Sequence, residues 1–186
     1  NVENTADHGL ITCGSTRLFT GSQRPFILKR NPCGEAEWCR VINLVSVSSA
    51  SIAVKPTPDN GYVLLCHYNG NDRIYLFKFD GAGAMDWYKI FSPDSLINNE
   101  LVRGLHTDSL NFLITSFCYY PEWIKPYFIQ TDTAGNETWR LVYSQHTGLG
   151  YVGDAYASVR DAYGNYYAVG RRVNSPELLK FSGQGM

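Results

Sequence analysis

Three stretches of the chain place an acidic or amide residue, a glycine and a tryptophan at one spacing. They read N-P-C-G-E-A-E-W at 31–38, D-G-A-G-A-M-D-W at 80–87 and D-T-A-G-N-E-T-W at 132–139. The acidic side chain could ligate calcium or serve as a catalytic acid beside the aromatic ring. A calcium loop of the EF-hand type, however, alternates several acidic ligands, whereas one aspartate stands alone here. The pattern favours a structural role, in which the side chain accepts backbone N–H groups within a tight turn.

Histidine and cysteine show no spacing that is typical of a metal site. Neither a His-x-x-x-His pair nor a Cys-x-x-Cys pair occurs among the 4 histidines and 5 cysteines. Residues 148–153 match G-x-G-x-x-G, but a dinucleotide site needs a helix after this loop and a strand pattern follows instead. We therefore expect no metal and no cofactor.

Catalysis by paired carboxylates depends on distances that a sequence does not contain. Glycoside hydrolases use two carboxyl groups at a set separation in space. The candidates for such a pair are Glu35, Glu37, Glu100 and Asp154. Because no G-x-S-x-G elbow occurs either, no set of residues identifies a reaction, and a protein without catalysis is the favoured interpretation.

The segment 118–128, C-Y-Y-P-E-W-I-K-P-Y-F, is the densest in aromatic residues. In a loop between two strands, Tyr119, Tyr120 and Trp123 could form a stacking platform for a glycan or a protein. The alternative is that these rings pack into the core, as large aromatic side chains commonly do. Both interpretations remain open on the sequence alone.

Composition excludes two classes of partner. The formal net charge is −1 and the pI about 6.5, which gives no basic surface for nucleic acid. No run of 18 or more apolar residues occurs, so we expect no membrane-spanning helix. A protein or a glycan remains as the expected partner.

The three opening stretches belong to a repeat of about 50 residues. Their first residues, together with Ser182, lie at positions 31, 80, 132 and 182, at intervals of 49, 52 and 50 residues. A second motif, a polar turn followed by a short apolar strand, recurs out of phase with the first, as in D-N-G-Y-V-L-L-C at 59–66. Each unit contains four short strand patterns and no helical pattern.

The repeated residues suit a scaffold. Asp or Asn opens the turn, glycine supplies the positive φ that the turn needs, and tryptophan fills space between neighbouring units. The residues are Asn31, Gly34, Trp38, Asp80, Gly83, Trp87, Asp132, Gly135 and Trp139.

Tandem units of four strands predict an all-β chain and a β-propeller. A β-sandwich also has closely spaced short strands, but it does not explain a tryptophan that recurs at one phase. Residues 1–186 form a single propeller segment of about three and a half blades in this interpretation. Since a closed ring needs at least four blades, further blades are expected from a longer chain, a second copy or a partner.

Five cysteines leave at least one thiol unpaired within the chain. A turn at Cys33 could bring it close to Cys39, so these two are the candidates for a disulfide. The bridge depends on an oxidising compartment, and the residues alone leave it open.

The repeats resemble the propeller-like repeats of secreted Bacteroidetes proteins, which have the form D-G-G-Y-I-L-A-G…I-Y-L-x-K-x-D-x-x-G-N-x-x-W. The matching stretches are D-N-G-Y-V-L-L at 59–65, I-Y-L-F-K-F-D at 74–80 and G-N-E-T-W at 135–139. Many proteins of this kind are substrates of type IX secretion, so the resemblance implies export to the cell surface or medium and favours the Cys33–Cys39 bridge. It also implies O-glycosylation at Asp-Ser or Asp-Thr followed by an apolar residue, which fits Ser95, Ser109 and Thr133.

Two functions remain. The first is a secreted or surface β-propeller that binds a protein or a glycan, or has a structural role, without catalysis. The alternative is a carbohydrate-active propeller enzyme of the sialidase or lyase kind, because the Asp turn before a tryptophan loosely resembles the Asp-box of sialidases. An enzyme would gather charged residues from several blades around the ring's central opening.

Overall fold

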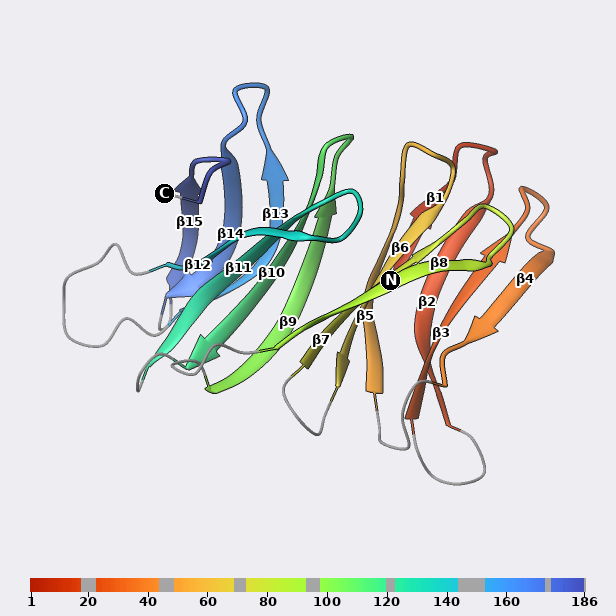
Figure 1. Cartoon of the computed structure of the whole chain (residues 1–186), viewed down its shortest axis with the longest axis horizontal. Helices are drawn as coiled ribbons and strands as arrows, with labels where there is room; N and C mark the ends of the chain where they lie inside the picture. Colours follow the sequence, from red (N-terminus) through yellow and green to blue (C-terminus); the bar gives the residue numbers. More distant parts are fainter. Residues whose placement is uncertain are drawn as a thin grey trace. The chain divides into compact units, whose positions relative to one another are not determined.

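The chain folds entirely into antiparallel β-sheet and turns, which confirms the prediction of an all-β protein. The structure, a computed structural model, describes residues 1–17, 23–43, 49–68, 73–92, 98–119, 123–143, 153–172 and 175–185, and for 98–100 the backbone alone. No helix occurs in these ranges, and so none that is long and apolar enough to cross a membrane. The strands make four separate sheets (Figure 1).

The chain divides into two compact units, each with two sheets. The first unit comprises Asn1–Ser92 and Thr107–Ser109. Its first sheet, in the order β1-β2-β3-β4, consists of β1 (Val2–Asn4), β2 (Leu10–Arg17), β3 (Gln23–Arg30) and β4 (Ala36–Val41). Its second sheet, in the order β5-β6-β7-β8, consists of β5 (Ser49–Pro56), β6 (Tyr62–Tyr68), β7 (Arg73–Phe79) and β8 (Met85–Phe91).

The second unit comprises Pro93–His106 and Leu110–Met186. Its four-stranded sheet, in the order β12-β11-β10-β9, consists of β9 (Asn98–Thr107), β10 (Asn111–Tyr119), β11 (Ile124–Asp132) and β12 (Glu137–Val142). Its other sheet has three strands within the described residues, β13 (Gly153–Arg160), β14 (Tyr166–Arg172) and β15 (Ser175–Phe181). Because each unit holds two of the sheets, their joining into one propeller segment stays a prediction.

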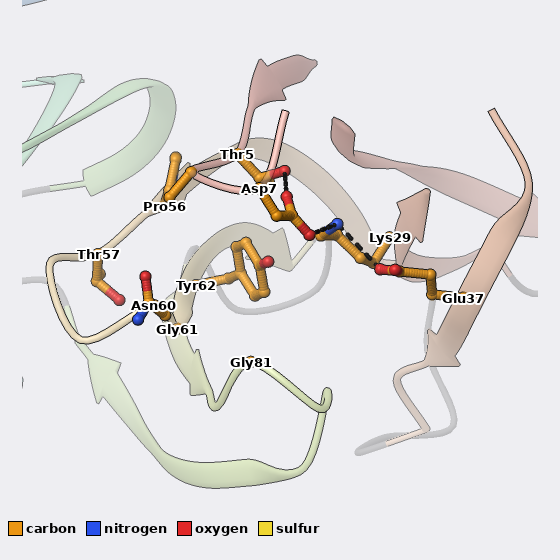
Figure 2. Close-up of a pocket in the computed structure, with 11 residues that line it drawn as sticks. Thr5, Asp7, Lys29, Glu37, Pro56, Thr57, Asn60, Gly61, Tyr62 and Gly81 are labelled. Atoms are coloured by element: carbon orange, nitrogen blue, oxygen red, sulfur yellow. Dashed lines mark hydrogen bonds and ion pairs between the residues drawn. The ribbon is translucent and has the colours of Figure 1, made fainter. Parts of the chain in front are cut away.

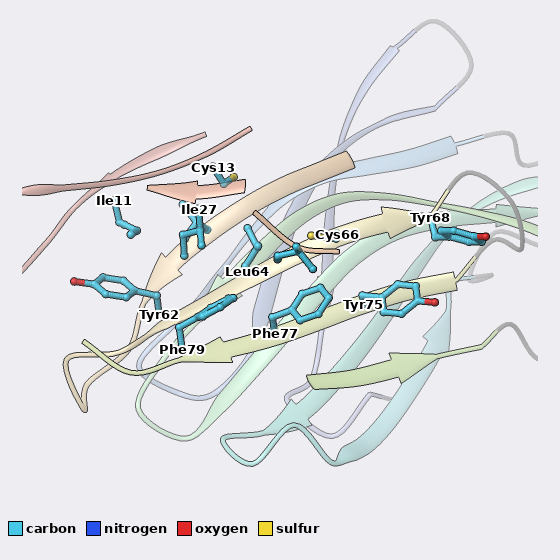
Figure 3. Packing of buried hydrophobic residues seen from close by; sticks show 12 residues of the cluster. Ile11, Cys13, Ile27, Tyr62, Leu64, Cys66, Tyr68, Tyr75, Phe77 and Phe79 are labelled. Atoms are coloured by element: carbon cyan, nitrogen blue, oxygen red, sulfur yellow. The ribbon is translucent and has the colours of Figure 1, made fainter. Parts of the chain in front are cut away.

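The core of the first unit lies between its two sheets. Apolar residues alternate along β2 and β3, so that Ile11, Cys13 and Ile27 point inward. Figure 3 shows them against side chains of the second sheet, among them Leu64 and Phe77. Aromatic side chains dominate this cluster, and their large buried area favours close contact between the sheets.

The core of the second unit is built on the same plan. Phe128 and Leu113 from the four-stranded sheet pack with Tyr166, Leu179 and Phe181 from the three-stranded sheet. The rings of Phe128 and Phe181 are 4.4 Å apart between centroids. The period of the sequence is therefore a period of packing as well.

A tryptophan on the last strand of one sheet contacts the turn of the next sheet in both units. The Trp38 indole N–H donates to the Gly81 carbonyl at 3.1 Å, and the Trp139 indole N–H donates to the Gly183 carbonyl at 3.0 Å. Each ring also lies on a tyrosine of the next sheet, with 5.7 Å between the centroids of Trp38 and Tyr62. We call this arrangement the Trp–turn contact.

The glycine of the receiving turn is required for two reasons. Gly83 has a φ of 78°, in the left-handed region that other residues avoid. A Cβ at Gly83 would also lie 2.7 Å from the Trp38 ring, and a Cβ at Gly185 would lie 2.8 Å from the Trp139 ring. Gly34 has the same backbone conformation with a φ of 83°, but no described atom lies within 4 Å of its Cβ position.

We expect Gly83→Ala to lower the free energy of unfolding by more than Gly34→Ala does. Both substitutions place a Cβ in the left-handed region, at a cost of about 1 kcal/mol. Only Gly83→Ala also forces the Trp38 ring off its turn, which adds about 1–3 kcal/mol of overpacking. Urea denaturation followed by circular dichroism measures both. Equal losses would show that the Trp–turn contact contributes nothing beyond backbone conformation.

Candidate functional site

The repeated Asp turns are closed by their own backbone and side chains. Asp132 Oδ1 accepts the N–H groups of Ala134 and Asn136 at 2.9 and 2.8 Å, and Asp80 Oδ1 accepts that of Ala84 at 2.8 Å. In the first repeat, Asn31 Oδ1 accepts the Glu35 N–H at 2.9 Å. These oxygens are occupied by the turn itself, so they are turn formers in the structure.

The glycines and tryptophans of the motif fall at equivalent places. Gly34, Gly83, Gly135 and Gly185 all have φ between 77° and 83°. Trp87 lies in β8, half-buried, at the position that Trp38 holds in β4. The motif is a scaffold element in each repeat that is described.

A buried lysine recurs at one position of the repeat, which the sequence pattern did not indicate. Lys29 is 2% exposed, and its Nζ lies 2.7 Å from Asp7 Oδ2 and 2.9 Å from Glu37 Oε2. Glu37 is the extra residue of a β-bulge, because Lys29 pairs with Trp38 while Arg30 pairs with Ala36. A bulge redirects a side chain, and this one directs a carboxylate toward the lysine.

A cavity of about 320 Å³ lies beside this lysine, in the first unit. Figure 2 shows Asp7 and Glu37 on either side of Lys29, with Tyr62, Thr57 and other residues of the next sheet on the far wall. The charged side chains that line the cavity, Asp7, Lys29 and Glu37, are already paired with one another. A charged ligand would have to displace these pairs.

The second repeat contains the same arrangement. Lys78 is 5% exposed and lies 2.8 Å from Asp59 Oδ2 and 3.7 Å from Asp86 Oδ2. Asp86 is again the bulge residue, since Lys78 pairs with Trp87 and Phe79 with Met85. Recurrence at the same phase in two sheets assigns both lysines to the scaffold, because a binding site has no need of two copies in adjacent sheets.

In the third repeat the lysine and the bulge carboxylate are both replaced by uncharged residues. Gln130 stands in the position of the lysine, and the bulge residue is Thr138, whose hydroxyl donates to Gln130 Oε1 at 2.9 Å. Gln130 is 4% exposed and donates through Nε2 to the Tyr166 hydroxyl at 2.9 Å. A buried polar group needs a partner, so the two positions change as a pair.

The ion pairs shift the pKa values of their carboxylates. The hydrogen bond from Lys29 is the main cause that lowers the pKa of Asp7. Burial raises the pKa of Asp59, but hydrogen bonds, that from Lys78 foremost, outweigh it and bring the pKa to about 2. Burial lowers the pKa of Lys29, and its bonds to the two carboxylates outweigh that effect and raise it.

The aromatic segment places two of its three candidate residues on the surface. Tyr119, at the end of β10, is 36% exposed, and Trp123, just before β11, is 46% exposed. Tyr119 pairs with Ile124, the residue after Trp123, so the two aromatic residues lie at the same end of the β10–β11 pair. Tyr120 lies outside the described residues.

Cys33 and Cys39 are both exposed and free, so the structure does not contain the bridge that the sequence suggested. Cys33 lies in the turn, whereas Cys39 lies three residues into β4. A strand advances about 3.3 Å per residue, which carries Cys39 about 10 Å from the start of β4. A disulfide requires Cα atoms within about 7 Å.

Of the positions proposed for O-glycans, Ser109 and Thr133 are exposed, and Ser95 lies outside the described residues. The carboxylates Glu35 and Glu37 are exposed, in the first unit. The side chain of Glu100 is not among those described. Within the described part of the chain, no group of three His, Cys, Asp or Glu side chains could hold a metal ion.

Asp154 has neighbours that the sequence did not point to. Its carboxylate lies 3.7 Å from Arg171 Nη2 and is hydrogen-bonded to Tyr156. Arg103 lies with its guanidinium 5.6 Å from the centre of the Tyr156 ring. We call Arg103, Asp154, Tyr156 and Arg171 the β13 cluster. The signal in the sequence is weak, since A-Y-A at 155–157 stands where the second repeat has S-I-A at 51–53.

Comparison with known proteins leaves the chain without an assigned family. No protein-family model and no curated protein matches it. Function must therefore be inferred from the geometry.

We expect the stability that Asp59 contributes to be lost in acid. Its folded pKa of about 2 lies below that of unfolded aspartate, about 3.9. The contribution is therefore complete above about pH 4 and disappears as the pH falls through about 2. It amounts to no more than about 1 kcal/mol, because the Asp59 side chain is 63% exposed and solvent screens the pair.

Urea denaturation of the protein and of Asp59→Asn at pH 7, 4 and 2.5 measures this contribution. The difference in the free energy of unfolding should shrink over the last interval. A difference that is the same at pH 7 and pH 2.5 would contradict the assigned ion pair.

Proposed function

We propose that the chain is part of a β-propeller that binds a protein or a glycan without catalysis. The observation that carries the binding role is the pair of exposed rings, Tyr119 and Trp123, at the adjoining ends of the paired strands β10 and β11. Large aromatic side chains dominate recognition surfaces because they offer broad contact area with few rotatable bonds. A paired hairpin holds them in place before a partner arrives, which reduces the entropy lost on binding.

The propeller itself is supported by the packing within each unit. Four antiparallel sheets follow one another in chain order, and within each unit the Trp–turn contact links the two sheets at the same phase of the repeat. A blade of a propeller packs on the next blade in this serial way. In a crystal structure or a cryo-EM reconstruction of the protein, we expect the four sheets to be arranged radially around one axis. Four sheets that do not surround a common axis would contradict the proposal.

We expect Tyr119→Ala with Trp123→Ala to weaken ligand binding at least tenfold. A glycan array with the intact protein identifies ligands, and isothermal titration calorimetry with the strongest one measures the affinity. Tyr163→Ala is the matched control, because Tyr163 is 92% exposed in the β13–β14 turn, away from this hairpin in sequence. Thermal melting should be unchanged in both variants, since all three rings are exposed.

Two outcomes would overturn the binding role of this hairpin. One is an unchanged affinity in the double variant, and the other is an equal loss in the Tyr163→Ala control. Analysis of the glycan after incubation separates binding from the alternative of a carbohydrate-active enzyme, because an enzyme would release products.

A further inference from the structure

The second unit contains a buried carboxylate oxygen without a partner. Asp154 is 5% exposed, and its Oδ1 accepts no hydrogen bond from any residue that the structure describes. Its other oxygen lies 3.7 Å from Arg171 Nη2, beyond hydrogen-bond distance. A buried carboxylate oxygen left without a donor costs free energy, so the fold alone gives no reason for this carboxylate.

Tyr156 lies at a β-bulge two residues after Asp154. The register between β13 and β14 shifts between Ala155 and Ala157, which leaves Tyr156 as the extra residue. Its ring is 41% exposed. The hydrogen bond with Asp154 raises the pKa of Tyr156, so the hydroxyl keeps its proton and donates to the carboxylate. Bulges of this kind often lie beside binding sites, because they redirect one side chain out of the sheet.

Two arginines complete the cluster with positive charge. The Arg103 guanidinium lies 4.9 Å from the centre of the Phe117 ring and 5.6 Å from that of Tyr156, which fixes its position. Arg171 is 59% exposed, and its Nη2 lies 3.7 Å from Asp154 Oδ2. The planar donor fork of arginine matches carboxylate and other oxyanions.

The close approach of β9 to the bulge depends on Gly104. A Cβ at this position would lie 2.5 Å from the Tyr156 carbonyl oxygen. Because glycine has none, the backbone of β9 comes close enough for Arg103 to lie over the bulged ring. The cluster therefore draws on β9, β13 and β14 together.

Comparison with the equivalent strands shows that the scaffold does not need these groups. The sheet of β5 and β6 has the same bulge, between Ser51 and Ala53, with Ile52 in the place of Tyr156. Ala50 stands in the place of Asp154, since it pairs with His67 as Asp154 pairs with Arg171. The bulge thus forms with apolar residues, whereas the lysine pairs recur between repeats. The polar groups are particular to the second unit.

We propose that the β13 cluster binds an acidic carbohydrate. Arg103 and Arg171 receive the anionic group, and the buried Asp154 positions Arg171 and Tyr156 beside it. The exposed face of Tyr156 provides apolar contact for the sugar ring. This inference rests on the proposed binding function and names its ligand class, but it places the ligand at different residues from Tyr119 and Trp123.

Titration of the intact protein with oligogalacturonate tests the proposal, with a neutral galactose oligomer of equal length as the comparison. We expect calorimetry to detect binding of the acidic oligomer that is at least tenfold tighter than that of the neutral one and weakens with added salt. A sulfated oligosaccharide shows whether the arginines select carboxylate or accept any oxyanion. Equal affinity for the acidic and neutral oligomers, or no binding of either acidic probe, would overturn the proposal.

Substitutions in the cluster provide the second test. Arg171→Gln and Tyr156→Phe should each weaken binding of the acidic oligomer about tenfold or more. Thermal melting should change little in Arg171→Gln, because Arg171 is 59% exposed, and should fall in Tyr156→Phe, because the buried Asp154 loses a donor. Arg73→Gln is the matched control, since it removes one exposed positive charge from the first unit. Equal affinity in Arg171→Gln and Arg73→Gln would place the ligand elsewhere.

The two proposals fail separately. If a neutral glycan binds and the double variant of Tyr119 and Trp123 abolishes this binding, while the acidic oligomer does not bind, the binding module stands and the β13 cluster is not its site. If the acidic oligomer binds and depends on Arg171 but not on Trp123, the ligand class holds and the hairpin is not the contact.

Discussion

The Trp–turn contact is the interaction on which the packing of consecutive sheets depends. Trp38 crosses from the last strand of one sheet to the turn of the next, where its N–H finds the Gly81 carbonyl and its ring covers Gly83. The turn needs a residue with positive φ and without a side chain at that position, and glycine meets both conditions. A short local motif thereby joins elements that lie more than 40 residues apart.

The lysine pairs add a second condition on the same strands. The bulge that places Trp38 also directs Glu37 toward Lys29. The residue before the tryptophan is thus the ion-pair partner of the buried lysine on the neighbouring strand. Replacement of lysine by Gln130 is accompanied by Thr138 at the bulge. The buried polar residue and the bulge residue are hydrogen-bond partners in each case, so we expect a change at one position to require a matching change at the other.

Differences between the repeats point to binding more clearly than their shared residues do. The shared Asp, Gly and Trp positions are engaged in turns and inter-sheet packing. Among the described strands, β5 has the same bulge as β13 but holds Ala50 and Ile52 in the places of Asp154 and Tyr156. A repeated fold supplies several equivalent positions, and binding residues can occupy one of them without disturbing the others.

The sequence by itself determined the strands, the turns and the all-β class. Strand alternation and the Asp-x-x-Gly turn depend on backbone geometry over a few residues, so the pattern around Asp132 or Gly83 could be interpreted without its surroundings. Only the tertiary structure decided which side chains meet. Lys29 reaches Asp7 across 22 residues, and Arg103 reaches Tyr156 from another sheet, because sheet packing and bulges bring them together. The Cys33–Cys39 bridge, which the sequence left open, is absent from the structure, where both cysteines are free and Cys39 lies within an extended strand.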